Sequence, residues 1–163
     1  MIKRTLQGVL EQYIGKGKAI LLIGARQVGK STLFHMLTDS VAEDTLLWLN
    51  CDLQNVRDTL NNPTLTTLQL LLANRKVVVI DEAQRVTNVG MTLKLIVDNF
   101  PQIQLLVTGS SALDLHNRLN EPLTGRKIEY RLYPLSTGEL YSAKGMLGVN
   151  ELFERRLVYG SYP

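Results

Sequence analysis

The chain has 163 residues, of which 45% are hydrophobic and 20% are charged, and this length and composition suit one globular domain. Its net charge of +3 is too small to indicate a nucleic-acid-binding protein, which usually carries a dense basic stripe. The single cysteine excludes an intrachain disulfide, and no apolar run reaches the roughly 18–20 residues that a membrane span needs. We therefore expect a cytoplasmic protein without a membrane partner.

Strands and helices are predicted to alternate along the chain. In chain order, the patterns predict a helix at 3–13, a strand at Ala19–Ile23, a helix at Ser31–Leu37, a strand at Leu46–Asn50, a helix at 65–72, a strand at Val77–Ile80, a helix at 89–99, a strand at Ile103–Val107, a helix at Ser111–Leu119, a strand at Ile128–Tyr133, a helix that starts at Ser136–Glu139 and a last helix at 150–158. Residues 51–63 are polar and rich in turn residues, so no element is predicted there. The alternation predicts a three-layer α/β fold in one domain, with a mainly parallel sheet.

A glycine-rich loop follows the first predicted strand, and residues 24–31 match the complete pattern G-x-x-x-x-G-K-[ST]. Its glycines let the backbone N–H groups point at phosphate oxygens, and the next helix adds the positive end of its dipole. In this pattern Lys30 reaches the β- and γ-phosphates and the Ser31 hydroxyl binds magnesium. The predicted nucleotide-binding residues are Gly24, Ala25, Arg26, Gln27, Val28, Gly29, Lys30, Ser31 and Thr32. A chance match is the alternative, and the strand before the loop and the helix after it argue against one.

Two acidic residues, Asp81 and Glu82, follow the β-branched run Val77–Ile80. The carboxyl end of a buried strand in such a sheet lies beside the phosphate loop. Asp81 is predicted to bind magnesium, mostly through bound water, and Glu82 to activate the attacking water. The alternative is that the pair only caps the next helix. An activated water favours hydrolysis of the γ-phosphate over its transfer to a small molecule.

Hydroxyl residues follow the fourth predicted strand. If that strand lies between the strands that end at residues 23 and 80, Thr108 or Ser110 could hydrogen-bond the γ-phosphate or the water. Equally, Ser110 or Ser111 could only cap the following helix.

Three longer side chains have two interpretations each. Arg126 could enter the site of a neighbouring subunit as an arginine finger, or it could lie on the surface. Gln84 and Arg85 could contact the neighbouring loop, or only solvent.

The sequence resembles the prokaryotic AAA-type ATPases of AAA family fourteen. The resemblance rests on GARQVGKSTL at 24–33, VVVIDEAQR at 77–85, LLVTGSSALDL at 105–115, LTGR at 123–126, YPLSTGEL at 133–140 and YGSYP at 159–163. It implies a P-loop sheet with strand order 5-1-4-3-2, and ATP rather than GTP, because the guanine-reading Asn/Thr-Lys-x-Asp motif is absent. Family roles fall on Lys30 and Ser31 for phosphate and magnesium, on Asp81 for magnesium and on Glu82 for water. The Thr108–Ser111 stretch matches the first sensor region, and Arg126 matches the family's Gly-Arg element.

The resemblance also implies a domain organisation. Residues 1–163 correspond to the ATPase core, with residues 1–15 as an N-terminal helix. Family members usually continue past the YGSYP position into a lid-like helical region and a carboxyl-terminal domain that can resemble a nuclease. We therefore expect a truncated or split protein with weakened nucleotide affinity and slow turnover.

Three functions are compatible with the sequence. The first is magnesium-dependent ATP hydrolysis that drives a conformational change in a partner or in the missing domain. The second is an ATP-gated switch that turns over rarely, and the third is a nucleic-acid-remodelling motor, against which the lack of an aromatic-interleaved basic stripe counts. Homo-oligomers are compatible with each. The physiological target is not encoded in such a core, because function on this fold lies in grafted regions.

Overall fold

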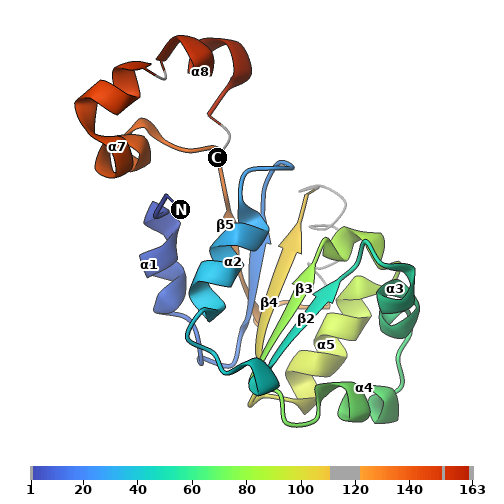
Figure 1. Cartoon of the computed structure of the whole chain (residues 1–163). Coiled ribbons are helices and arrows are strands. Elements are labelled where there is room, and N and C mark those ends of the chain that lie inside the picture. The colour runs from blue at the N-terminus through green and yellow to red at the C-terminus, as the bar shows by residue number, and fades with distance from the viewer. Residues whose placement is uncertain (1, 111–121, 152, 162–163) are drawn as a thin grey trace.

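A five-stranded parallel sheet forms the centre of the fold (Figure 1). The structure, a computed structural model, describes residues 2–110, 122–151 and 153–161. The strands are β1 (Ala19–Ile23), β2 (Leu46–Asn50), β3 (Val77–Asp81), β4 (Gln104–Gly109) and β5 (Lys127–Arg131). Their order is β2-β3-β4-β1-β5 and every neighbouring pair is parallel. The predicted fold class and strand order are therefore confirmed.

The three inner strands are buried along their whole length, whereas β2 and β5 at the two edges are only partly buried. Because successive side chains of a strand point to opposite faces, each inner strand contributes residues to two separate hydrophobic clusters. Ile20, Val79 and Leu106 belong to the cluster on one face of the sheet, and Leu21 and Val78 belong to the cluster on the other face. This explains why the inner strands are unbroken apolar runs rather than alternating ones.

Helices cover both faces of the sheet, which gives the three layers (Figure 1). On one face lie α1 (Thr5–Glu11) and α2 (Lys30–Thr38), which bury Leu10, Leu33 and Phe34. On the other lie α3 (Gln54–Leu60), α4 (Leu65–Leu72) and α5 (Val89–Asn99), which bury Leu60, Leu68, Leu93 and Ile96. Short 3₁₀ segments, η1 (Glu43–Thr45) and η2 (Ala83–Arg85), precede β2 and follow β3. None of the described helices is long and apolar enough to cross a membrane.

The prediction that residues 51–63 lack regular structure is wrong, because α3 occupies Gln54–Leu60. Its composition is polar, and it is held by one buried leucine and by contacts of Arg57 with the loop that precedes it. Leu60 is buried in the core, and the Arg57 guanidinium donates to the carbonyls of Cys51 and Asp52 at 2.7 Å each. The helix expected at Ser111–Leu119 lies outside the described residues.

The last helices lie outside the body formed by the sheet and its two layers (Figure 1). They are α7 (Thr137–Glu151), which Gly145 interrupts with a φ of 69°, and α8 (Phe153–Tyr159). The predicted capping box is present at the start of α7. Ser136 Oγ accepts from the Glu139 N–H at 3.1 Å, and Glu139 Oε2 accepts from the Ser136 N–H at 2.8 Å.

A buried ion pair connects the starts of α1 and α7 to the phosphate loop. Arg4 Nε donates to Glu139 Oε1 at 3.1 Å, and both side chains are less than a tenth exposed. The same guanidinium donates to the carbonyls of Val28 at 2.8 Å and Tyr133 at 2.5 Å. Glu139 Oε1 also accepts from the Thr5 N–H at 2.8 Å. The starts of α1 and α7 and the loop are thus held together by two side chains.

Burial alone would raise the pKa of Glu139. The N–H groups of Ser136 and Thr5 and the Arg4 guanidinium outweigh burial and lower this pKa from 4.5 to about 2. The folded protein therefore strongly favours the ionised carboxylate.

This shift predicts a pH-dependent contribution to stability. Because the folded pKa is below the unfolded one, the contribution is complete above about pH 4.5 and is lost as the pH falls toward 2. We expect Glu139→Gln to lower the free energy of unfolding by roughly 3 kcal/mol at pH 7, and by less as the pH approaches 3. Urea unfolding between pH 7 and pH 3 measures the difference, with Glu11→Gln, at an exposed carboxylate of α1, as the control. A difference in the free energy of unfolding between the wild-type and Glu139→Gln proteins that does not change with pH would contradict the lowered pKa of Glu139.

Candidate nucleotide-binding site

Residues 24–29 connect the carboxyl end of β1 to the first turn of α2. Two residues of this loop have left-handed backbone conformations, Gln27 with a φ of 62° and Gly29 with a φ of 91°. Left-handed conformation is uncommon for a residue with a side chain, and such outliers concentrate at functional sites. The loop therefore turns sharply just before the helix whose amino end it forms.

The first glycine of the loop is required by close packing rather than by its torsion angles. The Gly24 N–H donates to the Gly109 carbonyl at 3.2 Å, which ties the loop to the end of β4. A Cβ atom at this position would lie 2.3 Å from the Leu132 carbonyl oxygen. The chain leaving β5 thus leaves no space for a side chain at residue 24.

Lys30 lies inside the loop with only 5% of its surface exposed. Its Nζ donates to the carbonyls of Gly24 at 3.0 Å and Ala25 at 2.9 Å. Burial lowers the pKa of the Lys30 ammonium, the carboxylates of Glu82 and Asp81 oppose that shift, and Arg26 adds to it. A positive group is therefore held in the loop beside both predicted acids.

Asp81, the last residue of β3, joins this loop to the neighbouring strand. Its Oδ2 accepts from Ser31 Oγ at 2.8 Å, and its Oδ1 accepts from Thr108 Oγ1 in β4. Thr108 Oγ1 in turn accepts from the Glu82 N–H at 3.0 Å. The structure thus brings together Ser31, Asp81, Glu82 and Thr108 at the carboxyl edge of the sheet.

Glu82 follows Asp81 with a left-handed backbone, φ 55° and ψ 43°. Gln84, in η2, donates through Nε2 to Glu82 Oε2 at 2.5 Å and to Ser110 Oγ at 2.8 Å. Ser110 donates its N–H back to Gln84 Oε1 at 3.2 Å. Of the two interpretations of Gln84, contact with the neighbouring loop is the one the structure supports.

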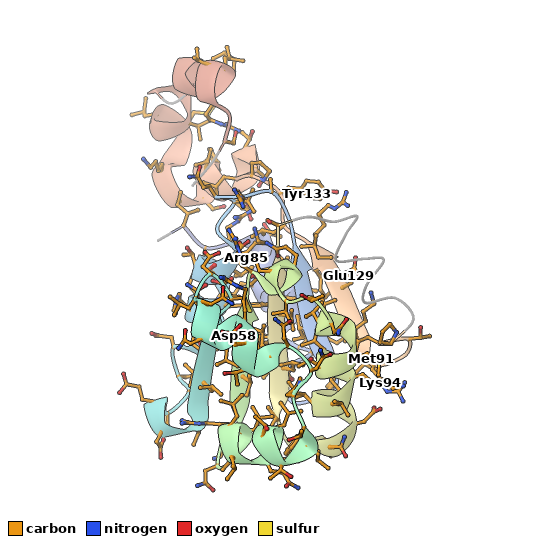
Figure 2. All side chains as sticks on the ribbon, turned by 90° about the vertical axis from the view of Figure 1, so that its right-hand side faces the viewer. Asp58, Arg85, Met91, Lys94, Glu129 and Tyr133 are labelled. Atoms are coloured by element: carbon orange, nitrogen blue, oxygen red, sulfur yellow. The ribbon has the colours of Figure 1, made fainter. Side chains whose placement is uncertain are left out.

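Arg85 forms an ion pair with Asp52 on the loop after β2. In Figure 2, Arg85 lies toward the end of the molecule from which the chain continues past Tyr133 to α7. It therefore contacts a neighbouring loop at the rim of the site, and it is exposed.

A cavity of about 510 Å³ opens at this edge, within the roughly 300–1,000 Å³ typical of ligand pockets. Its polar lining comes from Arg4, Gln27, Gly29, Lys30, Ser31, Thr32 and Glu82, and its apolar lining from Ile2, Leu33, Met36 and Leu135. Five of its lining residues belong to the predicted nucleotide-binding set, and Glu82 faces the same space. The cavity therefore combines a polar phosphate loop with apolar side chains.

Arg126 lies at the opposite edge of the sheet. It precedes β5, and its carbonyl accepts from the N–H of Ala19, the first residue of β1. Its guanidinium forms an ion pair with Asp98 of α5. The structure does not bring Arg126 to the cavity of its own chain, so a role in a neighbouring copy stays a prediction.

The donor set suits magnesium better than a metal held by protein alone. Among residues 2–110, 122–151 and 153–161, no group of three or more His, Cys, Asp and Glu side chains is placed to hold a metal ion. Magnesium is usually held by one or two carboxylates together with substrate phosphates and waters. The adjacent hydroxyl of Ser31 and carboxylate of Asp81 fit that requirement.

A protein-family model matches most of this chain. The model of AAA domain family fourteen matches residues 16–141, which is most of the chain. The chain belongs to this family. The matched range includes the phosphate loop, the acidic pair and the Ser136–Glu139 capping box, so this AAA domain carries the whole cluster described above.

Relatives of this AAA domain are longer. An uncharacterized protein of Haemophilus influenzae is 28% identical over 156 residues, which cover 88% of this chain and 39% of that protein. An uncharacterized protein of Mycobacterium tuberculosis is 31% identical over 76% of this chain and 27% of its own length. The chain thus spans well under half the length of the curated relatives it matches.

Solved structures support the fold. A Walker-type ATPase of Pyrococcus abyssi has a TM-score of 0.64 and 20% identity, covering 100% of this chain and 65% of that one. Domain III of the replication initiation protein DnaA from Thermotoga maritima has a TM-score of 0.57 and 12% identity, covering 93% and 72%. At these identities the likeness establishes the architecture of the AAA domain and nothing finer.

Sequence reasoning missed Arg4, which lines the cavity and contacts the phosphate loop. No local signal identifies it, because its partners Val28, Tyr133 and Glu139 are 24 to 135 residues away. The position of Arg126, by contrast, could have been foreseen, since a residue before a parallel strand lies at the edge opposite the phosphate loop.

The packing around the loop predicts opposite effects for two glycine substitutions. Gly24→Ala places a methyl group against the Leu132 carbonyl, so we expect roughly 1–3 kcal/mol of destabilisation. Gly8→Ala is the matched control, because a Cβ there meets nothing within 4 Å and alanine favours the helix by about 1 kcal/mol. Thermal unfolding of both variants measures the difference. A Gly24→Ala protein as stable as the Gly8→Ala protein would contradict the packing described here.

Proposed function

We propose that this AAA domain binds ATP with magnesium and hydrolyses its γ-phosphate, and that the cycle drives a conformational change in a further domain or a partner. The observation that carries the proposal is that Lys30, Ser31 and Glu82 line one cavity, while Asp81 accepts a hydrogen bond from Ser31. Each residue type matches one requirement of phosphoryl transfer to water.

The phosphate loop supplies the binding step. Backbone N–H groups of the loop and the amino end of α2 favour an anion there. Lys30 Nζ, which donates to the Gly24 and Ala25 carbonyls, would exchange these neutral acceptors for charged phosphate oxygens. Charge-assisted hydrogen bonds are the stronger ones, so the exchange favours binding.

Magnesium, when bound with the nucleotide, neutralises charge on the β- and γ-phosphates. Ser31 Oγ and Asp81 would hold it, with Asp81 acting mainly through water. The hydroxyl of Thr108 donates to Asp81 and fixes the orientation of that carboxylate. Thr108 therefore supports the site through Asp81 and the Glu82 N–H, rather than by a contact of its own with phosphate.

Glu82 would orient the attacking water and accept its proton. It faces the cavity that Lys30 and Ser31 also line, which is the placement a general base needs. A kinase that transfers the phosphoryl group to a small substrate does not need this additional acid beside Asp81. Hydrolysis is therefore the reaction that the residues favour.

The apolar part of the cavity suits the base of a nucleotide. Ile2, Met36 and Leu135 give it a surface against which a flat heterocycle can pack. The sequence has no guanine-reading Asn/Thr-Lys-x-Asp motif, so adenine is the proposed base.

Arg4 offers a direct route from the loop to the rest of the molecule. The guanidinium that contacts the Val28 carbonyl also pairs with Glu139 at the start of α7. A change in the loop on nucleotide binding or hydrolysis would therefore act on α7. This contact supports a conformational output, whether turnover is fast or slow.

The role of Glu82 predicts a separation of binding from turnover. We expect Glu82→Gln to keep the affinity for ATP with magnesium and to lower the rate of phosphate release by roughly 100-fold or more, because the amide cannot accept the proton. Steady-state phosphate release and a fluorescent-nucleotide titration measure both, with Glu43→Gln, an exposed acid in η1, as the control. Equal, negligible rates in the wild-type and Glu82→Gln proteins would contradict hydrolysis and favour an ATP-gated switch.

A further inference from the structure

The side chain of Gln84 uses both ends of its amide to connect two elements of the site. Its Nε2 lies 2.5 Å from Glu82 Oε2 and 2.8 Å from Ser110 Oγ, and its Oε1 lies 3.2 Å from the Ser110 nitrogen. A carboxylate only accepts and a backbone N–H only donates, so these partners fix which end of the amide faces which group. Gln84 thus bridges Glu82 after β3 to Ser110 after β4.

We propose that Gln84 is a positioning residue for hydrolysis. Gln84 fixes the Glu82 carboxylate by donating to Glu82 Oε2. The other carboxylate oxygen, Glu82 Oε1, is left to receive the proton of the attacking water. Gln84 also makes the position of Glu82 depend on Ser110 at the end of β4. The inference rests on the proposed role of Glu82 as the base.

A neutral amide suits this task better than a cation. Glutamine can hold the carboxylate in place without pairing its charge, whereas a lysine or arginine there would form an ion pair with it. Glutamate has several rotamers, and ordering such a side chain costs conformational entropy. The hydrogen bond from Gln84 would order the Glu82 side chain before the substrate binds, and such preorganisation accelerates a reaction.

The bridge also gives Ser110 a defined part in the site. Ser110 Oγ accepts from Gln84 Nε2, which leaves its own hydroxyl proton for another acceptor. A γ-phosphate oxygen is an acceptor of the right chemistry. Ser110, Gln84 and Glu82 would then form a chain of hydrogen bonds along which the presence of the γ-phosphate influences the base.

Gln84 could instead only stabilise η2, and kinetics separate the two roles. Gln84→Leu has a similar volume and makes no hydrogen bonds. Gln54→Leu is the matched control, because Gln54 lies on the exposed face of α3, where its amide bonds Asp58 at 2.7 Å. A purely structural role predicts a lower melting temperature with unchanged kcat.

The experiment measures single-turnover ATP hydrolysis and the Kd for ATP with magnesium in wild-type, Gln84→Leu, Gln54→Leu, Glu82→Gln and the Glu82→Gln/Gln84→Leu double variant. We expect Gln84→Leu to lower the hydrolysis rate about 10- to 100-fold with Kd within about threefold. In the Glu82→Gln background the second substitution should cause no further loss, since residues that act as a unit are not additive. A Gln84→Leu rate within about twofold of wild type, or an equal additional loss in the double variant, overturns the proposal.

A second readout does not depend on turnover. In nucleotide-free protein, NMR signals of the Gln84 side-chain amide should shift in Glu82→Ala and in Ser110→Ala, and stay unchanged in Gln54→Leu. Unshifted signals in both variants overturn the bridge itself, whatever the rate of hydrolysis. If the shifts occur but wild-type and Glu82→Gln hydrolyse ATP equally, the proposed function fails, and the role of Gln84 in hydrolysis fails with it, while the bridge stands.

Discussion

The hydrogen bond from Ser31 to Asp81 joins the two halves of the site, and it depends on the parallel sheet. Because β1 and β3 run in the same direction on either side of β4, the loop after one strand and the acid that ends the other meet at a single edge. The residues are 50 positions apart in sequence, so only this topology brings them together. An antiparallel arrangement would place them at opposite edges. The cavity, the placement of Lys30 and the proposed chemistry all follow from that constraint.

The phosphate loop has contacts on two sides, with the central sheet and with α7. Inward, Asp81 and Thr108 tie it to β3 and β4. Outward, Arg4 ties it to the start of α7, which lies outside the body of the fold. Nearly all of the Arg4 and Glu139 side chains is buried, so movement of the loop is resisted unless α7 also adjusts. Under the proposed function, this contact would transmit a nucleotide-driven change from the phosphate loop to α7.

Much of this arrangement could be predicted from sequence. Buried parallel strands are continuous apolar runs, so β1, β3 and β4 were recognisable, and the acids at the carboxyl end of β3 could be assigned to the edge that carries the phosphate loop. The strand order came from family resemblance. What could not be predicted depends on distant partners. Helix α3 is polar and is held by the buried Leu60, and Gln84 finds Ser110 across 26 residues. Neither the burial of Leu60 nor the contact between Gln84 and Ser110 leaves a pattern in the neighbouring sequence.

The most direct test of the account is a calorimetric titration of ATP, with and without magnesium, into the wild-type protein and the Asp81→Asn variant. If Ser31 and Asp81 form the metal-binding part of a triphosphate site, magnesium should tighten wild-type binding by roughly tenfold or more. The variant should bind ATP weakly and nearly independently of magnesium. A wild-type protein with no measurable affinity for ATP, or with an affinity that magnesium does not change, would contradict the account.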